Sequence, residues 1–497
     1  MEKQTLKSNL NRYIIANFPI IYINAFEESK IDSNINSIDL GRKIYEWNES
    51  SGFIDFENKT PVFEDYTLED TLDYFKFSQI LKQNIIVFKD IVSYLDNPKI
   101  VSKLKTIAKM ISEGIDATII IVSNIVVTPK ELENYITILE MDYLSYSEIK
   151  NVISDFIKEN PCDISDKFME ELALSFKGLT EFEINNLLAL AYADSGEINR
   201  SDLGLIFEQK QQIIKKAGIL EMIPLKETIN DIGGLDNLKQ WFERKAKIYK
   251  NINNAMKFGV DMPKGVLIVG VPGCGKTLNA KAAAKLFEVP LLRLDMGRLM
   301  GKYIGESEEN LRKAIFLAEA ISPCVLWIDE LEKAFAGIGG IGGGSDITTR
   351  LFGNFLTWLQ EKDSPTFVVA TANDISKLPP ELLRKGRFDD IFYVDLPSDK
   401  EREKIFEIHI NKRRPQDLRN INIKELVSKT KGYSGADIES VVKDSVENAF
   451  ANNQNSISTN EILNAINNTS SLSELMRESL DKLTSEYKRH KFKNASI

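Results

Sequence analysis

Short apolar runs, separated by segments whose apolar residues have helical spacing, recur along the chain. They cover residues 20–23, 85–88, 118–122, 266–269, 325–328 and 367–370. Runs of this length that alternate with helices are typical of the buried strands of parallel sheets joined by crossover helices. The pattern therefore predicts an α/β protein in which the strand–helix arrangement occurs twice.

Two pairs of segments indicate that the second arrangement repeats the first. Residues 177–184 (KGLTEFEI) resemble 431–438 (KGYSGADI), and residues 118–124 (TIIIVSN) resemble 366–373 (TFVVATAN) with one insertion. The offset is about 250 residues in both pairs, and a fixed offset is what an internal repeat produces. Chance similarity between two α/β domains stays open as the alternative.

A glycine-rich motif, GVPGCGKT, occupies residues 270–277, directly after the apolar run 266–269 and before a helical pattern over 278–287. This is the context of a P-loop, whose glycines let backbone N–H groups surround phosphates at a helix N-terminus. Lys276 would reach the β- and γ-phosphates, and the Thr277 hydroxyl would ligate Mg²⁺. The residues expected to bind the nucleotide here are Pro272, Gly273, Cys274, Gly275, Lys276, Thr277 and Leu278.

Acidic and amide residues follow the next two apolar runs. Asp329 and Glu330 end the segment CVLWIDE, where Asp329 would hold the Mg²⁺ shell and Glu330 would polarise the attacking water. Asn373 follows the run 367–370, where its side chain can orient that water. Two adjacent acids at a strand end are also compatible with a plain surface position.

Two arginines, Arg384 and Arg387, flank Gly386 shortly after Asn373. They could form a solvated surface pair. In a ring of subunits they would instead act as arginine fingers, because a planar guanidinium can stabilise the charge that develops on a neighbour's γ-phosphate. On that interpretation each site is completed by the next subunit.

The first half of the chain lacks this chemistry. Its first apolar run is followed by NAFEESK, which has no glycine to wrap a phosphate, and Glu27 and Glu28 there would repel one. The run 85–88 is followed by Lys89 and Asp90 instead of two acids. We therefore expect this half to serve assembly or partner binding.

Composition and charge argue against several classes of function and several kinds of site. The formal net charge of −10 and the pI near 5.2 argue against a protein that lives on nucleic acid or anionic lipid. Three scattered cysteines do not make a disulfide framework, and two histidines leave little room for histidine-based metal sites. No apolar run approaches the roughly 20 residues that span a bilayer. A location in the cytoplasm, or in the stroma of a plastid, is expected.

From Asp231 to Asp437 the chain resembles the AAA ATPases proper, through DIGGL, the P-loop, CVLWIDE, LRKGRFD and GAD. The segments 291–299 and 318–327 look like one subgroup, the uncharacterised AAA proteins named as a hypothetical chloroplast reading frame and shared with cyanobacteria. The resemblance implies ATP and Mg²⁺ as ligands and a ring, expected to be hexameric. It also implies that Ile232, Gly233 and His409 line the adenine pocket.

Tyr303, in the segment KYIGES, stands where AAA threading machines place an aromatic pore loop. An aromatic side chain there would grip an extended polypeptide. A surface tyrosine just before a helix N-cap at Ser307 is the alternative. The glycine-rich stretch 337–344 would be a second pore loop or a plain flexible connection.

The predicted fold is thus a P-loop AAA+ core with a parallel sheet and a helical lid, preceded by a degenerate AAA-like α/β domain. The expected boundaries are 1–200 for the degenerate domain, 201–228 for a linker, 229–400 for the core and 401–497 for the lid and a final helix. ATP-driven remodelling of an unknown protein partner by a ring is the leading function. A slow ATP-dependent switch or scaffold and, less favoured, a nucleic-acid motor are the alternatives.

Overall fold

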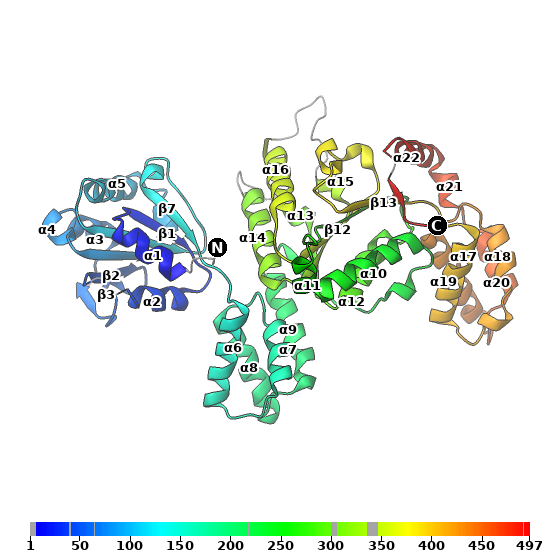
Figure 1. The fold of residues 1–497 in the computed structure, drawn as a ribbon, viewed down its shortest axis with the longest axis horizontal. Coiled ribbons are helices and arrows are strands. Elements are labelled where there is room, and N and C mark those ends of the chain that lie inside the picture. Colours follow the sequence, from blue (N-terminus) through cyan, green and yellow to red (C-terminus); the bar gives the residue numbers. More distant parts are fainter. Residues whose placement is uncertain are drawn as a thin grey trace. The chain divides into compact units, whose positions relative to one another are not determined.

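The computed structural model describes residues 6–38, 41–63, 65–216, 218–299, 306–334, 346–490 and 492–497. The chain divides into two compact units. One contains the residues up to 145 together with 180–186, and the other contains 146–179 and 187–497 (Figure 1). Among the described helices, none has both the length and the apolar character needed to cross a membrane.

The first unit is built on a seven-stranded sheet of order β4-β3-β2-β5-β6-β1-β7. Its strands are β1 (Ile20–Asn24), β2 (Lys43–Asn48), β3 (Gly52–Asp55), β4 (Pro61–Phe63), β5 (Asn84–Lys89), β6 (Ala117–Ser123) and β7 (Ile136–Glu140). The strands β2, β5, β6, β1 and β7 are parallel, and β3 and β4 extend the sheet antiparallel. β5 and β6 are buried along their whole length, which explains the unbroken apolar runs in their centres.

Helices cover both faces of this sheet. They are α1 (Leu6–Ile15), α2 (Glu28–Asn36), α3 (Leu68–Phe75), α4 (Ser78–Leu81) and α5 (Pro98–Ser112), with 3₁₀ turns η1 (Val92–Tyr94) and η2 (Glu133–Tyr135). The apolar sides of α3 and α5 pack in one core, and those of α1 and α2 pack in the core on the other face.

The second unit begins with the helices α6 (Tyr146–Glu159), α7 (Asp166–Ser175), α8 (Glu181–Ser195) and α9 (Leu203–Lys216), except that the residues of α8 up to 186 belong to the first unit. Its sheet has the order β14-β13-β9-β12-β11-β10-β8. The strands are β8 (Leu220–Ile223), β9 (Gly265–Gly270), β10 (Leu291–Leu294), β11 (Cys324–Ile328), β12 (Thr366–Ala372), β13 (Asp390–Val394) and β14 (Lys493–Asn494). Only β8 runs antiparallel to its neighbour.

The helices around this sheet are α10 (Asp236–Lys250), α11 (Ile252–Lys257), α12 (Lys276–Phe287), α13 (Met296–Leu299), α14 (Glu306–Ile321), α15 (Leu331–Ala334) and α16 (Asp346–Glu361). Figure 1 shows α10 and α12 on one face and α14 and α16 on the other. Trp241, Phe242, Phe287 and Phe367 dominate the core under α10 and α12.

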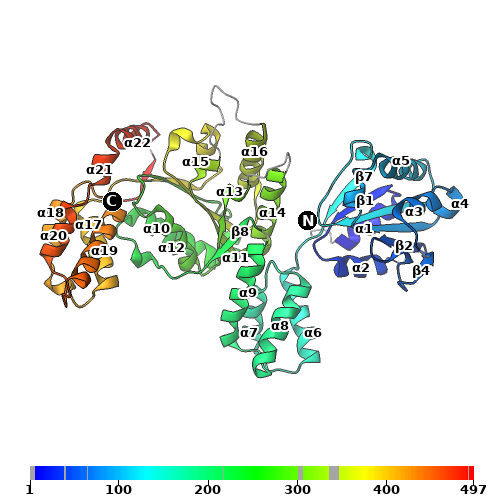
Figure 2. The same cartoon turned by 180° about the vertical axis from the view of Figure 1, so that it is seen from behind.

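Four more helices, α17 (Asp399–Arg413), α18 (Ile423–Lys429), α19 (Gly435–Ala451) and α20 (Thr459–Asn467), form a lid with its own apolar core. Both views show them as a separate group beside the sheet (Figure 1, Figure 2). The short α21 (Leu472–Leu475) and α22 (Arg477–His490) follow. Further 3₁₀ turns are η3 (Arg200–Asp202), η4 (Ile229–Asp231), η5 (Ile375–Lys377), η6 (Pro380–Leu383) and η7 (Leu418–Asn420).

The strand order supports the predicted internal repeat. β2-β5-β6-β1-β7 and β10-β11-β12-β9-β13 have the same order along the chain and the same parallel direction. The first set is followed by the four helices α6 to α9, and the second by the four helices α17 to α20 of the lid. Asp90, two positions after Phe88, has a φ of 55°. Glu330, two positions after Ile328, has a φ of 51°. A positive φ is uncommon outside glycine, so its recurrence at equivalent strand ends is a specific shared feature.

Two of the predicted boundaries are wrong. The segment 201–228, expected as a linker, contains α9, which is the fourth helix after the first sheet, and β8, which pairs with β10. The polar run EQKQQ in α9 concealed its packing, because Ile206, Lys210 and Ile214, one helical turn apart, suffice to bury one face.

The second correction concerns the end of the lid. Residues 493 and 494 do not belong to the lid but form β14, which pairs with β13 of the core sheet. A two-residue strand carries no alternation of apolar and polar positions that the sequence could reveal.

Lys210 is 2% exposed, and its ammonium donates a 2.6 Å hydrogen bond to the Ser175 carbonyl. The pKa of Lys210 is lowered to about 7, mainly by burial and to a smaller extent by the nearby Lys177. Since the usual value is 10.5, the unfolded chain binds a proton that the folded chain does not bind between pH 7 and pH 10.5. The contribution of Lys210 to stability therefore falls as the pH drops through this window.

We expect Lys210→Met to reduce the loss of stability that occurs as the pH drops, because methionine fills similar space without a charge. The free energy of unfolding of the variant relative to the wild type, measured by urea titration, should be higher at pH 7 than at pH 9.5, by a difference on the order of 1–3 kcal/mol. Lys216→Met, at an exposed position of the same helix, is the control and should show no such pH dependence. Equal shifts at the two pH values would contradict the charge argument.

Candidate functional site

A cavity of about 360 Å³ opens in the second unit beside the carboxyl ends of β9, β11 and β12. Parallel pairing puts these ends on one edge of the sheet, which is where ligands of open α/β sheets bind. Most residues singled out in the sequence line this cavity: Ile232, Gly233, Pro272, Gly273, Cys274, Gly275, Lys276, Thr277, Leu278, Asp329, Glu330, Asn373 and His409.

The glycine-rich loop joins β9 to α12 in a conformation that depends on its glycines. Gly273 and Gly275 have φ of 74° and 84°, and a Cβ on Gly270 would lie 2.0 Å from the Val394 carbonyl oxygen. Other residues would therefore strain or displace the loop. The backbone is shaped to surround an anion at the N-terminus of α12.

The Lys276 side chain folds back onto this loop. Its Nζ donates to the carbonyls of Gly270 and Val271, at 2.9 and 2.7 Å, and the residue is 6% exposed. Burial lowers the pKa of Lys276 to about 8. An anionic phosphate in the cavity would offer this ammonium a charged partner in place of two carbonyls.

Two oxygen donors whose chemistry fits Mg²⁺ lie between α12 and β11. Thr277 Oγ1 is 3.5 Å from Asp329 Oδ1, and the Thr371 hydroxyl also donates to that oxygen. A hydroxyl and a carboxylate at this spacing fit Mg²⁺, which prefers oxygen ligands and keeps several sites for water and phosphate. Among the described residues, no group of three or more His, Cys, Asp or Glu side chains is arranged to hold a metal ion.

The Glu330 carboxylate is held from two sides. Asn373 Nδ2 lies 3.4 Å from Oε1, and Lys333 Nζ lies 2.6 Å from Oε2. The Glu330 backbone N–H donates to Thr371 Oγ1 at 3.2 Å. Thr371 thus contacts both acids of the site.

The Glu332 side chain holds the backbone at the carboxyl end of β12. It is 5% exposed, and its Oε1 accepts the Asn373 backbone N–H at 3.0 Å. Burial raises the pKa of Glu332. Sequence reasoning missed Thr371, Lys333 and Glu332; the acid two positions after Glu330 was the only local signal, and it does not say which strand it contacts.

The lid forms the other end of the cavity. Ile405, Ile408 and His409 of α17 line this end of the cavity together with Ile232 and Gly233 of the core. A Cβ on Gly233 would lie 2.4 Å from Ile405 Cγ1, so only glycine permits this approach. Burial lowers the pKa of His409, which favours a neutral imidazole at neutral pH. This apolar end suits a flat base.

A second lid helix touches the glycine-rich loop. The Ala436 N–H, in the first turn of α19, donates to the Gly273 carbonyl at 2.9 Å. Ser434 caps this helix through the Asp437 N–H at 3.2 Å. The positive end of α19 therefore faces the cavity.

Arg384 and Arg387 do not line the cavity of their own chain. Arg384 is exposed, and Arg387 is half-buried. Tyr303 and the stretch 337–344 lie outside the described residues.

In the first unit a glutamate side chain lies at the position equivalent to the glycine-rich loop. The Glu27 carboxylate, 8% exposed, accepts the backbone N–H groups of Glu181 and Phe182 at 3.2 and 2.9 Å, in the first turn of α8. That contact corresponds to the one between Gly273 and α19. A side-chain carboxylate therefore occupies the positive helix end that could otherwise attract a phosphate.

Lys89 takes the place that Asp329 has in the second unit. Its Nζ lies 2.8 Å from Asp32, 3.5 Å from Glu46 and 3.6 Å from Glu28, and the residue is 6% exposed. A lysine there is the wrong charge for holding Mg²⁺, and its acidic partners neutralise it within the unit.

Comparison with known families matches both units. Residues 266–396 match the ATPase family associated with various cellular activities (AAA), and residues 420–464 match the AAA+ lid domain. Residues 6–141 and 147–217 match the N-terminal and second domains of SpoVK-like AAA ATPases. The second of these matches includes α9, in agreement with the corrected boundary.

Two of the relatives match nearly the whole chain. The chain is 36% identical over 495 residues to the "Uncharacterized AAA domain-containing protein ycf46" of Pyropia yezoensis, which spans 98% of this chain and 99% of that protein. The protein of the same name from Guillardia theta is 37% identical, over 94% of this chain and 92% of its own. A cell division cycle protein 48 homolog of Archaeoglobus fulgidus is 36% identical over 43% of this chain and 29% of its own length.

Thr371 offers a test of the metal geometry. We expect Thr371→Val, which removes the hydroxyl that contacts Asp329 and the Glu330 N–H, to raise the Mg²⁺ concentration for half-maximal ATP turnover and to lower kcat about 10-fold. Thr371→Ser keeps the hydroxyl and should stay close to the wild type. If valine and serine behave alike, Thr371 does not position the acids.

Proposed function

Because the chain belongs to the AAA ATPase family, we propose that it binds ATP with Mg²⁺ and hydrolyses the γ-phosphate at the cavity of the second unit. The observation that supports this most is the convergence of Lys276, Thr277, Asp329, Glu330 and Asn373 on one cavity from the start of one helix and two strand ends. Surface acids and a chance glycine-rich motif would not meet in this way.

Each residue has a role that its chemistry allows. Lys276 binds the β- and γ-phosphates, and Thr277 and Asp329 hold Mg²⁺, which neutralises phosphate charge when bound. Glu330 polarises the attacking water, and Asn373, whose amide lies 3.4 Å from Glu330, orients it. Ile232, Gly233 and His409 accommodate the adenine.

The active site is shared between copies in this proposal. Arg384 and Arg387 lie outside their own cavity, so they are available to a neighbour's γ-phosphate. A head-to-tail contact of this kind closes into a ring when the rotation allows it, and we propose a hexamer.

The ring would remodel a protein partner. The first unit, whose equivalent site is filled by Glu27, would bind that partner or serve assembly, in the cytoplasm or in a plastid stroma. A slow ATP-dependent switch that binds a partner through the same unit is the second candidate, favoured by the loss of chemistry there. The net charge of −10 disfavours a nucleic-acid motor.

Complementation between two inactive variants tests the shared site. The Lys276→Ala variant should not bind nucleotide in its own cavity, but it still presents Arg384 to the cavity of the neighbouring subunit. The Arg384→Ala variant has an intact cavity but lacks that arginine. Each variant alone should be inactive, and an equal mixture should recover about a quarter of the wild-type rate if copies mix randomly in a ring. Lys385→Ala, at the exposed neighbouring position, is the control and should keep full activity.

Failure to recover, with both variants inactive and assembled, would contradict a site completed by the neighbour. The wild-type rate per subunit should also rise with protein concentration, because dilution separates the copies. The Glu330→Gln variant would then hold ATP without hydrolysis and serve to trap a partner.

Tyr303 distinguishes a threading ring from a switch. We expect Tyr303→Ala to keep basal ATP turnover but to lose the stimulation caused by casein, an unfolded polypeptide, since the aromatic grip would be gone. Tyr303→Phe should keep the stimulation. A switch predicts that casein has the same effect, or none, on all three proteins.

A further inference from the structure

The segment after α22 returns to the core sheet. β14 pairs in parallel with β13, with Phe392 opposite Lys493 and Tyr393 opposite Asn494. The Ala495 N–H donates to the Tyr393 carbonyl at 2.9 Å, and Ala495 is fully buried in the core under α10 and α12. The segment is therefore an integral strand of the second unit.

The same residues bind the first turn of α10. The Leu238 N–H donates to the Ala495 carbonyl at 3.1 Å, and Asn237 Nδ2 donates to the Ser496 carbonyl at 2.6 Å. Backbone N–H groups in the first turn of a helix have no partner within the helix. The segment satisfies one of them.

Ser496 reaches from this position to the lid. Its hydroxyl donates to Glu401 Oε1 at 2.6 Å, and that oxygen also accepts the Leu235 N–H at 3.0 Å. Glu401, in the first turn of α17, is 8% exposed. Burial opposes its charge, but the hydrogen bonds from Ser496, Leu235 and Ser398 outweigh burial and lower the pKa of Glu401.

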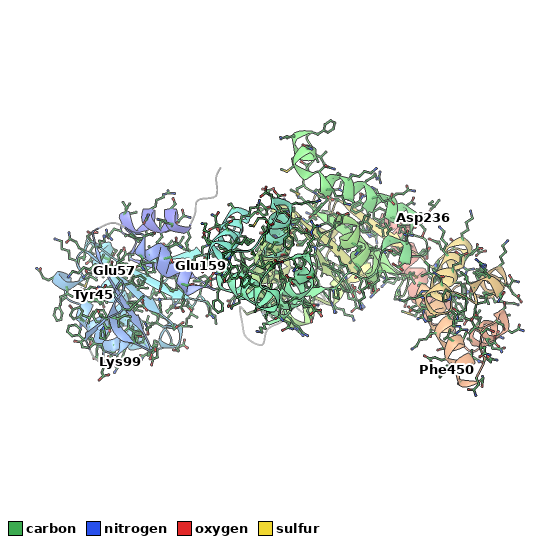
Figure 3. All side chains as sticks on the ribbon, turned by 90° about the horizontal axis from the view of Figure 1, so that it is seen from below. Tyr45, Glu57, Lys99, Glu159, Asp236 and Phe450 are labelled. Carbon is green, nitrogen blue, oxygen red and sulfur yellow. The ribbon has the colours of Figure 1, made fainter. Side chains whose placement is uncertain are left out.

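Glu401 is consequently the point where lid, core and the last strand meet. A further ion pair, Asp236 to Lys404 at 3.7 Å, joins α10 to α17 beside it. Figure 3 labels Asp236 in the first turn of α10, on the side of the lid.

This junction borders the base end of the cavity. Ser496 and Glu401 both line the cavity, together with Ile232, Ile405 and His409. Any opening between α17 and α10 would separate the two walls of that end.

We propose that residues 493–496 act as a clasp that holds the base end of the nucleotide cavity together, with Ser496 as a positioning residue for Glu401. The proposal rests on ATP binding at this cavity, as proposed above. Docking of the clasp and nucleotide binding are then thermodynamically linked, so each strengthens the other by the same factor. The clasp acts on affinity and not on the chemical step, because it lies at the base end, away from Glu330.

The test uses the full chain and the fluorescent nucleotide mant-ATP. Ser496→Ala should weaken mant-ATP binding and raise the KM for ATP about 3- to 10-fold, with kcat unchanged. Ser496→Thr keeps the hydroxyl and should restore the affinity. Ser479→Ala, an exposed serine of α22, is the matched control and should bind like the wild type.

Hydrogen exchange of the Leu238 amide gives a second readout, since that amide donates to the clasp. Nucleotide should slow its exchange in the wild type and less so in Ser496→Ala. If the wild type fails to bind mant-ATP, the proposed function is at fault. If the wild type binds mant-ATP, but Ser496→Ala binds it equally well and nucleotide does not change the exchange rate of the Leu238 amide, the proposed role of the clasp is wrong.

Discussion

Parallel pairing of β12 with β9 on one side and β11 on the other is the constraint on which the candidate site depends. It brings the glycine-rich loop, the two acids after β11 and the polar residues after β12 to one edge of the sheet. Short contacts across that edge, such as Thr371 to Asp329 and Glu332 to the Asn373 N–H, then follow from register. The buried strands supply the rigidity that a site with 3 Å contacts needs.

The same strand order without the same side chains explains the first unit. Its core of β1, β5 and β6 is as apolar as that of the second unit, so the fold is retained by burial alone. At the strand ends, Glu27 and Lys89 stand where the second unit has the glycine-rich loop and Asp329, and each has partners within the unit. Fold and chemistry are therefore separable here, since they depend on different residues.

Long-range partners were hardest to foresee from the sequence. α9 was mistaken for part of a linker because the polar residues on its outer face outnumber Ile206 and Ile214 on the inner one. The return of residues 493–496 to β13 depends on a free sheet edge about 100 residues earlier in the chain, and sequence periodicity does not report such an edge. For the same reason no local pattern marks Glu401, in the first turn of α17, as the residue that joins lid, core and clasp.

The sequence by itself determined the fold class, the repeated strand–helix order and the residues that line the cavity, because these are encoded in contiguous motifs and local periodicity. The P-loop, for example, carries its glycines, its lysine and its helix start within a single stretch. Only the tertiary structure decided which side chains support those residues: Thr371 under both acids, Glu332 behind Asn373, and Ser496 against Glu401. Such contacts join residues far apart in the chain, so they depend on strand register and lid placement, which no local pattern specifies.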